Sequence, residues 1–352
     1  MNIYKQRMPA LDGLRGVASL LVLLSHTSNA QFYYFPSLNF SGVGKSGVFL
    51  FFLLSSFLLS MPLLESESGI FRKQRILRYW HRRIVRIYPT FTLYLLLALL
   101  SSSFFSYIDG YEGKGLPFYL DLEGFWSHFT LQQGEGVTWS IGVEFKFYFL
   151  LPFIALFIKW ARFVNATFAV FVIVAICIYS QLIIPQSEVL QNDTRVNAYM
   201  PVFAFGVLLG LIQTSLTSCR CNPLLEWVIR ISGYIGILGI IIMTPSFYSF
   251  MVTEVEYNYF HNQIFLHALL WALVILSSVN IDGIVSSVLQ TPILRFLGKI
   301  SFGVYLYHPI FITILLQFKL NEFLSAWLIL LATIATATIS YHTIEQPMNK
   351  IR

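Results

Sequence analysis

Apolar runs long enough to be membrane spans recur along the whole of this 352-residue chain. A helix needs about 20 apolar residues to cross roughly 30 Å of hydrocarbon. Hydrophobic residues make up 56% of the chain and charged residues only 11%, so polar surface is too scarce to cover a soluble particle. We therefore predict an all-α, polytopic integral membrane protein that forms one transmembrane domain over residues 1–352. About ten spans are expected: Leu11–Ala30, Gly42–Leu64, Ile87–Tyr107, Val137–Ile158, Phe163–Ile184, Ala198–Gln213, Leu225–Thr244, Phe260–Val279, Leu297–Phe318 and Phe323–Thr343.

Lysine and arginine alternate between the segments that join these spans. The basic residues gather in the loop after the second span and near both termini: Arg72, Lys73, Arg75, Arg78, Arg82, Arg83 and Arg86, then Lys5, Arg7, Lys350 and Arg352. The positive-inside rule then predicts that both termini lie in the cytoplasm. Because the formal charge of +6 is concentrated in loops, as orientation signals and anion sites are, we expect no nucleic-acid partner.

The three cysteines and the N-terminus add two expectations. Cys177 lies inside a span, and Cys219 and Cys221 share a short loop, which indicates neither a disulfide framework nor a metal site. Arg15 splits the first apolar run, and no small-residue cleavage site precedes the next polar stretch. We therefore expect the first span to be retained rather than cleaved as a signal peptide.

The first span carries two ionisable residues, Arg15 and His26, that hydrocarbon does not favour. Their separation is about three helical turns, so both side chains share one face, roughly 16 Å apart along the axis. Ionisable residues inside a span usually face the bundle interior or a wet cavity, which makes the pair a functional-site hypothesis. The alternative is that Arg15 extends to the cytoplasmic surface and His26 makes a helix-to-helix hydrogen bond.

A stripe of arginines leads into the third span. Arg75, Arg78, Arg82 and Arg86 follow one another on one face of a helix that continues at Ile87. A planar guanidinium binds phosphate oxygens in a fork, so this cytoplasmic entrance suits a nucleotide-containing cofactor. Membrane topology and anionic lipid headgroups alone explain a basic loop equally well.

The fourth span places Ser140 and Glu144 on one face, just after Trp139. Because this span enters from the outside, Glu144 lies about 10 Å below the outer surface. The carboxylate then shares a level with His26, where it would orient the imidazole and raise its basicity. The alternative is a purely structural contact between Glu144 and Lys146 or an arginine.

The ninth span carries a second polar face, formed by Ser301, Tyr305 and His308. An isolated histidine in a membrane is more often a hydrogen-bonded core residue than a catalyst. Together with the other polar faces, however, these residues are candidates for contact with a substrate.

Taken together, these stretches resemble acyltransferase family 3, the membrane acyltransferases that modify cell-surface glycans. The resemblance covers nearly the whole chain. It rests on Leu11 to Gly16 with His26, Phe51 to Leu59, Arg82 to Pro89, Trp139-Ser140 with Glu144 and Phe147-Tyr148, Ser301 to Pro309, and Glu345-Gln346-Pro347. The chain departs from the family in one place, because Ser56 stands where the family usually has glycine. Serine is the next smallest residue that still permits close helix approach.

The resemblance implies a ten-span enzyme of the bacterial inner membrane, surrounded by lipid, that takes an acyl group from cytoplasmic acyl-CoA. The group is most often acetyl, so acetyl-CoA is the expected donor, with no metal. The acceptor is a hydroxyl at the outer side, on a sugar of an O-antigen, an exopolysaccharide or a lipid-linked precursor. Some members carry a further periplasmic esterase-like domain. We expect a stand-alone membrane form, in which direct transfer suffices or such a partner is a separate protein.

Specific roles follow for the candidate residues. The donor phosphates would lie at Arg78, Arg82, Arg83 and Arg86, and Arg15 and Glu144 would join His26 in the catalytic set. His26 would be the general base on the acceptor hydroxyl, or it would form a covalent acyl intermediate. The acceptor would contact Trp139, Ser140, Ser301, Tyr305 and His308. The competing interpretation is a transporter or flippase for a glycolipid or organic anion, since buried charges also mark proton-coupled pathways.

Overall fold

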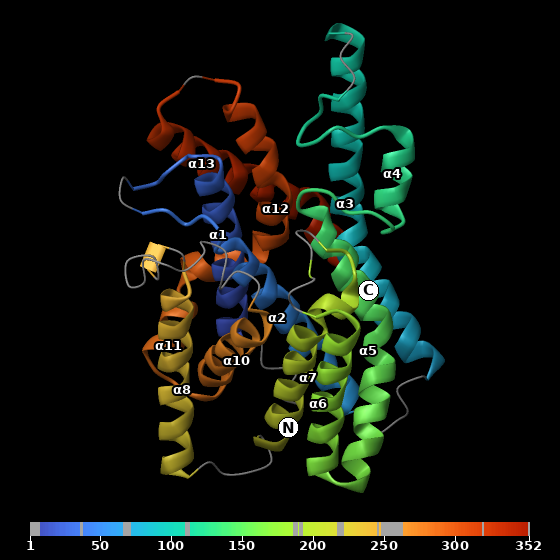
Figure 1. Cartoon of the computed structure of the whole chain (residues 1–352), viewed down its shortest axis with the longest axis vertical. Helices are drawn as coiled ribbons and strands as arrows, with labels where there is room; N and C mark the ends of the chain where they lie inside the picture. The colour runs from blue at the N-terminus through green and yellow to red at the C-terminus, as the bar shows by residue number, and fades with distance from the viewer. Residues whose placement is uncertain are drawn as a thin grey trace.

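The computed structural model describes residues 8–35, 38–65, 72–109, 113–185, 189, 193–216, 222–244, 246–247, 263–318 and 320–350. The expectations for Lys5, Arg7, Cys219, Cys221, Arg352 and the start of the eighth span at Phe260 lie outside these residues. All regular elements in the described part are helices (Figure 1). In chain order they are α1 (Pro9–Asn29), α2 (Gly44–Leu64), α3 (Lys73–Asp109), α4 (Leu122–Phe129), α5 (Thr138–Val164), α6 (Ala166–Ile183), η3 (Val196–Tyr199), α7 (Met200–Leu216), α8 (Pro223–Ile242), α10 (Ile264–Asn280), α11 (Ile284–Leu289), α12 (Pro292–Leu315), α13 (Glu322–Ser340), η5 (Tyr341–Glu345) and α14 (Gln346–Lys350).

Each expected span falls on one of these helices, and the prediction of an all-α, polytopic membrane protein is confirmed. Seven helical segments of the described chain are long and apolar enough to cross a membrane: Gly44–Leu64, Lys73–Ile108, Thr138–Val164, Val196–Leu216, Pro223–Ile242, Pro292–Leu315 and Glu322–Lys350. The helices α6 and α10 are apolar but shorter, and α1, which carries Asp12, Arg15 and His26, is not among the seven.

The arginine stripe and the third span form one continuous helix, as their spacing predicted. Helix α3 runs for 37 residues from Lys73 to Asp109 and rises along one side of the molecule (Figure 1). The ninth span begins earlier than expected, at Pro292, and its helix continues past His308 with Pro309 inside it. The tenth span ends in a π-helical turn, Tyr341–Glu345, before α14.

Four helices begin at an Asn or Asp side chain that accepts a hydrogen bond from a backbone N–H of the first turn. Asp121 caps α4 through Gly124 at 2.7 Å, and Asn165 caps α6 through Thr167 at 2.8 Å. Asn222 and Asn321 cap α8 and α13 in the same way. These caps satisfy N–H groups that have no partner inside the helix, which explains why the helices start where they do.

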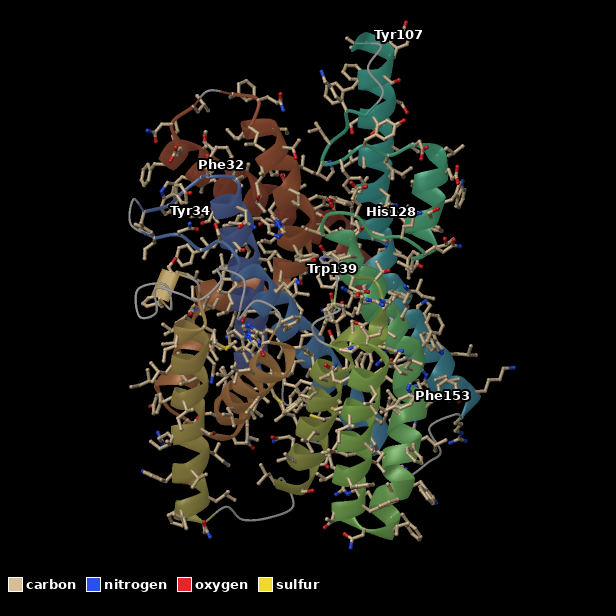
Figure 2. All side chains as sticks on the ribbon, viewed as in Figure 1. Phe32, Tyr34, Tyr107, His128, Trp139 and Phe153 are labelled. Atoms are coloured by element: carbon tan, nitrogen blue, oxygen red, sulfur yellow. The ribbon has the colours of Figure 1, made fainter. Side chains whose placement is uncertain are left out.

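Large apolar side chains cover the outside of the bundle. Phe171 and Leu182 of α6 and Leu238 of α8 are 64%, 76% and 58% exposed. Figure 2 shows Phe153 of α5 on the outer side of the molecule, whereas Trp139 of the same helix lies near its middle. A helix that is apolar on its outer face and packed on its inner face is what a lipid environment requires.

Helix α1 lies at the centre of the packing, against α12 and α2. The backbones of α1 and α12 approach closely because glycines face the contact on both sides. A Cβ atom on Gly298 would lie 1.7 Å from the Asp12 carbonyl oxygen, and one on Gly16 would lie 2.4 Å from the Leu294 carbonyl oxygen. Only glycine fits at either position. This contact brings Arg15 of α1 beside Ser301 of α12.

Gly298→Ala is expected to destabilise the protein by about 1–3 kcal/mol, because a methyl group there overlaps backbone rather than a movable side chain. The measurement is the thermal unfolding midpoint of the detergent-solubilised protein. Gly142→Ala is the matched control, since the closest atom to a Cβ at Gly142 is 3.9 Å away. Equal midpoints for the two variants would contradict the close contact between α1 and α12.

The departure from the family at Ser56 is accommodated by the opposing helix. Ser56 is fully buried in α2, and its hydroxyl donates to the Leu53 carbonyl at 3.1 Å. The facing residue of α7 is Gly206, where a Cβ atom would lie 1.8 Å from the Ser56 Oγ. A glycine on the partner helix therefore provides the close approach that a glycine at position 56 would provide.

Candidate active site

Three neighbouring cavities follow the polar face of α1. The arginine cavity, about 340 Å³, is lined by Arg15, Arg82, Arg83, Arg86, Ser301 and Glu345, among others. The middle cavity, about 60 Å³, is lined by Arg15, Arg86, Ser140, Glu144, Ser301 and Tyr305, with further residues. The histidine cavity, about 190 Å³, is lined by His26, Lys45, Val48, Trp139 and Tyr305, with further residues.

Neighbouring cavities share walls, so their order along the bundle is defined. Arg15, Arg86 and Ser301 line both the arginine and the middle cavity. Tyr305 and Val48 line both the middle and the histidine cavity. The arrangement therefore runs from the arginines, past Glu144, to His26. By helical rise, Arg15 and His26 are about 16 Å apart along α1.

The imidazole of His26 is held by a second imidazole. His26 Nδ1 lies 2.8 Å from His308 Nε2, and His308 Nδ1 lies 2.9 Å from the Val304 carbonyl oxygen. Because a carbonyl can only accept, His308 Nδ1 carries the proton, and a neutral His308 therefore accepts at Nε2. His26 then donates from Nδ1. Its Nε2 keeps the lone pair that a general base or nucleophile requires.

His308 was expected to contact the acceptor, and the structure places it against His26. Its side chain is fully buried, and the contacts at both ring nitrogens join it to α1 and to its own helix. This geometry allows His308 to hold the His26 ring in place, whereas contact between His308 and a substrate stays a prediction.

His308→Leu is expected to lower the turnover number about tenfold or more, because the tautomer and orientation of His26 are no longer fixed. His308→Gln is the conservative variant, since its amide oxygen can still accept the proton on His26 Nδ1. It should retain more activity than the leucine variant at equal protein abundance. The measurement is the initial rate of acyl transfer, and equal rates for both variants would contradict the positioning role.

Glu144 differs from the expectation in its partners. Its carboxylate accepts hydrogen bonds from the hydroxyl groups of Ser55 and Tyr148, the latter at 2.5 Å. Lys146, the alternative partner, instead donates to the Thr194 carbonyl at 3.0 Å. Glu144 and Ser140 do share a face, as their spacing predicted, and both line the middle cavity. The carboxylate is thus placed between the arginines and His26, and His308 takes the orienting position beside the imidazole.

The wall between the middle and histidine cavities is a hydrogen-bonded pair of hydroxyls. The Tyr305 hydroxyl donates to the Val137 carbonyl at 3.0 Å and lies 2.7 Å from the Ser140 Oγ. Trp139, beside Ser140, packs its ring 5.1 Å from that of Tyr199 and faces the histidine cavity. Ser140, Tyr305 and Trp139 are therefore brought together, as the sequence analysis expected for residues that contact one substrate.

Three of the four candidate donor-binding arginines line the arginine cavity. Arg82 is exposed, whereas Arg83 and Arg86 are half-buried, and the Arg83 guanidinium lies 5.9 Å from the centre of the Tyr148 ring. Arg83 also has a buried Nε atom without a hydrogen-bond partner in the described part of the chain. Arg78 is exposed and does not line this cavity. The helical stripe is therefore divided between a cavity wall and an exposed surface.

Comparison with known proteins bears on what this arrangement does. A family model described as an acyltransferase domain matches residues 8–344, nearly the whole chain. The chain belongs to this acyltransferase family. It is 25% identical to the peptidoglycan O-acetyltransferase OatA of Listeria monocytogenes, over 98% of this chain and 56% of that protein. It is 23% identical to the O-acetyltransferase OatA of Staphylococcus aureus, over 99% of this chain and 58% of that protein. The chain thus spans little more than half the length of these relatives. No solved structure is significantly similar to it.

The arginine cavity of this acyltransferase contains a carboxylate that the site prediction missed. Glu345 is 8% exposed, and its Oε1 atom has no hydrogen-bond partner among the described residues. It lies on the π-helical turn Tyr341–Glu345, a conformation that is frequent at functional sites. The sequence did contain a signal for this residue: the stretch Glu345-Gln346-Pro347 contributed to the family resemblance, but no role was assigned to Glu345.

Proposed function

We propose that this chain is a membrane O-acetyltransferase that moves an acetyl group from acetyl-CoA to a hydroxyl of a cell-wall glycan. One observation carries the proposal: a histidine with a fixed lone pair lies at one end of three adjacent cavities, and an arginine cluster lies at the other. The arginine forks suit the phosphates of the donor, and the imidazole suits proton abstraction from an alcohol.

In the proposed reaction the donor phosphates bind at Arg82, Arg83 and Arg86. The acetyl thioester then extends past Glu144 toward His26, a reach of about 16 Å. His26 Nε2 takes the proton of the acceptor hydroxyl as its oxygen bonds to the thioester carbonyl carbon. The resulting tetrahedral intermediate collapses, the carbon–sulfur bond breaks, and the leaving thiolate takes the proton from the imidazolium. Direct attack by His26 Nε2 on the carbonyl is the competing route.

The relatives direct the acceptor proposal toward the cell wall. The family resemblance implied a sugar of an O-antigen, an exopolysaccharide or a lipid-linked precursor as acceptor, but the Listeria relative is named for peptidoglycan. We therefore place a peptidoglycan strand first as acceptor. We further propose that the protein lies in the cytoplasmic membrane, with the arginine cavity facing the cytoplasm, in line with the basic loop that precedes it.

The test uses sealed proteoliposomes that contain the protein and enclose a soluble peptidoglycan fragment. Labelled acetyl-CoA is added outside, and the enclosed glycan is analysed by mass spectrometry. Labelled O-acetyl groups on the glycan, removable by mild base, are the expected result. Transport of glycan or donor across the membrane without ester formation would contradict the proposal and support the transporter interpretation.

A further inference from the structure

Lys45 is a buried cation in the cavity of His26. The side chain is only 9% exposed, although it belongs to the first turn of α2, close to the end of a span. It lines the histidine cavity together with His26, Trp139 and Tyr305, and no acidic side chain lines that cavity in the described part of the chain. No role was assigned to this lysine from the sequence.

Close packing of α2 on α1 holds Lys45 in this place. A Cβ atom on Gly47 would lie 2.5 Å from the Ala18 carbonyl oxygen, and one on Gly44 would lie 3.1 Å from the Ser25 side chain. These small residues seat the first turn of α2 against α1 at Ser25, the residue before His26. Lys45 and His26 therefore line one cavity from two helices packed against each other.

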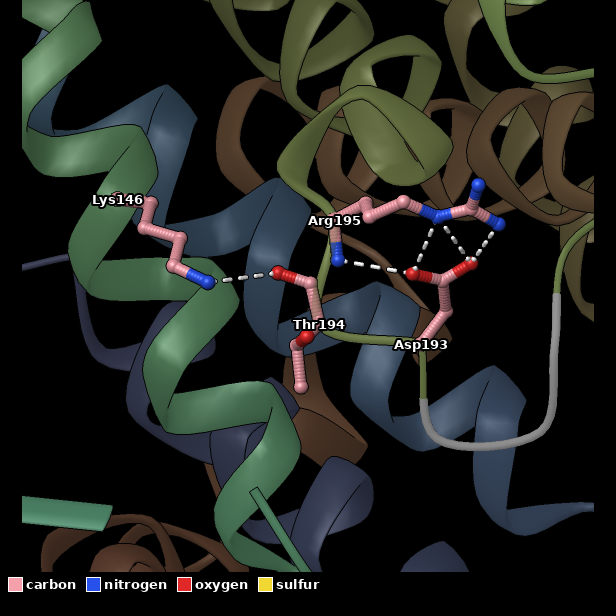
Figure 3. A network of polar contacts seen from close by, with 4 residues as sticks. All are labelled: Lys146, Asp193, Thr194 and Arg195. Atoms are coloured by element: carbon pink, nitrogen blue, oxygen red, sulfur yellow. Dashed lines mark hydrogen bonds and ion pairs between the residues drawn. The ribbon is translucent and has the colours of Figure 1, made fainter. Parts of the chain in front are cut away.

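A carboxylate of the segment before η3 interacts with Lys45. Asp193 is the acidic residue that acts electrostatically on Lys45. Asp193 also bonds to Arg195 (Figure 3). Arg195 Nη2 lies 2.6 Å from Asp193 Oδ2, and the backbone N–H of Arg195 donates to Asp193 Oδ1 at 2.8 Å. Two cations, Lys45 and Arg195, thus interact with one carboxylate, and Lys45 brings a positive charge to the cavity wall. Such a wall favours a negative charge inside the cavity.

We propose that the Lys45 ammonium group stabilises the oxyanion of the tetrahedral intermediate, an inference that rests on the proposed function. When the acceptor oxygen bonds to the thioester carbonyl carbon, the carbonyl π electrons move to its oxygen, which becomes negative. Lys45 donates a hydrogen bond to that oxygen. The electrons return as the carbon–sulfur bond breaks, and Lys45 keeps its proton throughout. A donor fixed in a water-poor cavity is worth far more to such an oxyanion than the same donor in water.

The decisive variant is Lys45→Met, which keeps the length of the side chain and removes the charge. Loss of one oxyanion donor typically costs about 100- to 1,000-fold in kcat. We expect that loss both for transfer to the glycan and for hydrolysis of acetyl-CoA, with the KM for the acceptor little changed. Lys45→Gln, which keeps a neutral donor, should retain more activity, and added methylammonium should partly restore Lys45→Ala.

Lys146→Met is the matched control, because Lys146 lies on neighbouring α5 and bonds to Thr194, within the segment that holds Asp193 (Figure 3). It should leave kcat nearly unchanged. An equal loss in Lys146→Met would mean that both lysines only hold the segment of residues 193–195. A rise in acceptor KM with unchanged kcat in Lys45→Met would assign Lys45 to acceptor binding. Either result would overturn the proposal.

Two further outcomes keep this inference separate from the proposed function. Absence of acetyl transfer by the wild-type protein would contradict the proposed function, whatever the Lys45 variants do. Normal transfer by the wild-type protein together with full kcat in Lys45→Met would contradict only the oxyanion role. If Lys45→Met fails to fold, as judged by size-exclusion chromatography in detergent, the glutamine variant and the methylammonium experiment decide the question.

Discussion

His26→Ala is expected to abolish acetyl transfer to glycan while the protein remains folded in the membrane. A general base contributes about 100- to 10,000-fold to the reaction rate. The alanine variant has no imidazole, so it lacks the Nε2 atom that would take the proton. His26→Gln should be equally inactive, because an amide nitrogen is not basic. The measurement is label transferred from acetyl-CoA to the glycan acceptor, normalised to the amount of protein in proteoliposomes.

His342→Ala is the control for loss of a histidine as such. The His342 ring is exposed, and its Nδ1 lies 3.0 Å from Gln346 Oε1, outside the three cavities. This variant should keep wild-type transfer. Retained transfer in His26→Ala, at normal abundance and with the control intact, would remove His26 from the chemistry. It would also remove the reason for His308 to be positioned as it is.

The sequence was sufficient for the helices because lipid imposes a simple rule on them. A helical span must hydrogen-bond all its backbone N–H and C=O groups within itself. Each long apolar run therefore predicts a helix, whatever packs beside it. The same periodicity placed Arg15 and His26 on one face of α1, and Ser140 and Glu144 on one face of α5. Both pairs line the cavities as expected. What depends on a single helix could therefore be predicted.

Contacts between helices could not be predicted, because they depend on how closely two backbones approach. His26 and His308 are 282 residues apart, and their contact exists because α1 and α12 touch at Gly16 and Gly298. The periodic pattern showed that each histidine lies on a polar face of its helix. It did not show which polar group of another helix lies opposite that face. A carboxylate is the usual partner for an imidazole, so Glu144 was the natural expectation. Its partner Tyr148 follows four residues later on the same face of α5, but its partner Ser55 lies on α2 and leaves no periodic signal.

Lys45 and Glu345 were missed for a related reason. Each lies at the end of an apolar run, where the positive-inside rule or solvent accounts for any charge. Burial alone distinguishes them, and burial there follows from tertiary packing: glycines seat α2 on α1 beside Lys45, and a π-helical turn carries Glu345. The glycines at positions 44 and 47 were the one sequence signal that this charge is held close to another helix.

Arg86→Ala is expected to raise the KM for acetyl-CoA about tenfold or more and to lower kcat much less. Arg86 lines both the arginine cavity and the middle cavity, and in the proposed reaction the donor phosphates would end there and the thiol arm would begin. A hydrogen bond to a charged group contributes about 1.5–3 kcal/mol, and loss of the guanidinium removes it from bound donor and transition state alike. Arg86→Lys keeps the charge but not the fork and should recover only part of the affinity.

Arg78→Ala distinguishes a built cavity from a basic surface. Arg78 belongs to the same helical stripe but is exposed and lies outside the arginine cavity. If the cavity binds the donor, initial rates measured against acetyl-CoA concentration should show a raised KM for Arg86→Ala and little change for Arg78→Ala. If the stripe only orients the protein or binds lipid headgroups, neither variant should change this KM. An equal rise in both would mean that the donor binds along the exposed face of α3, and that the cavity is not its site.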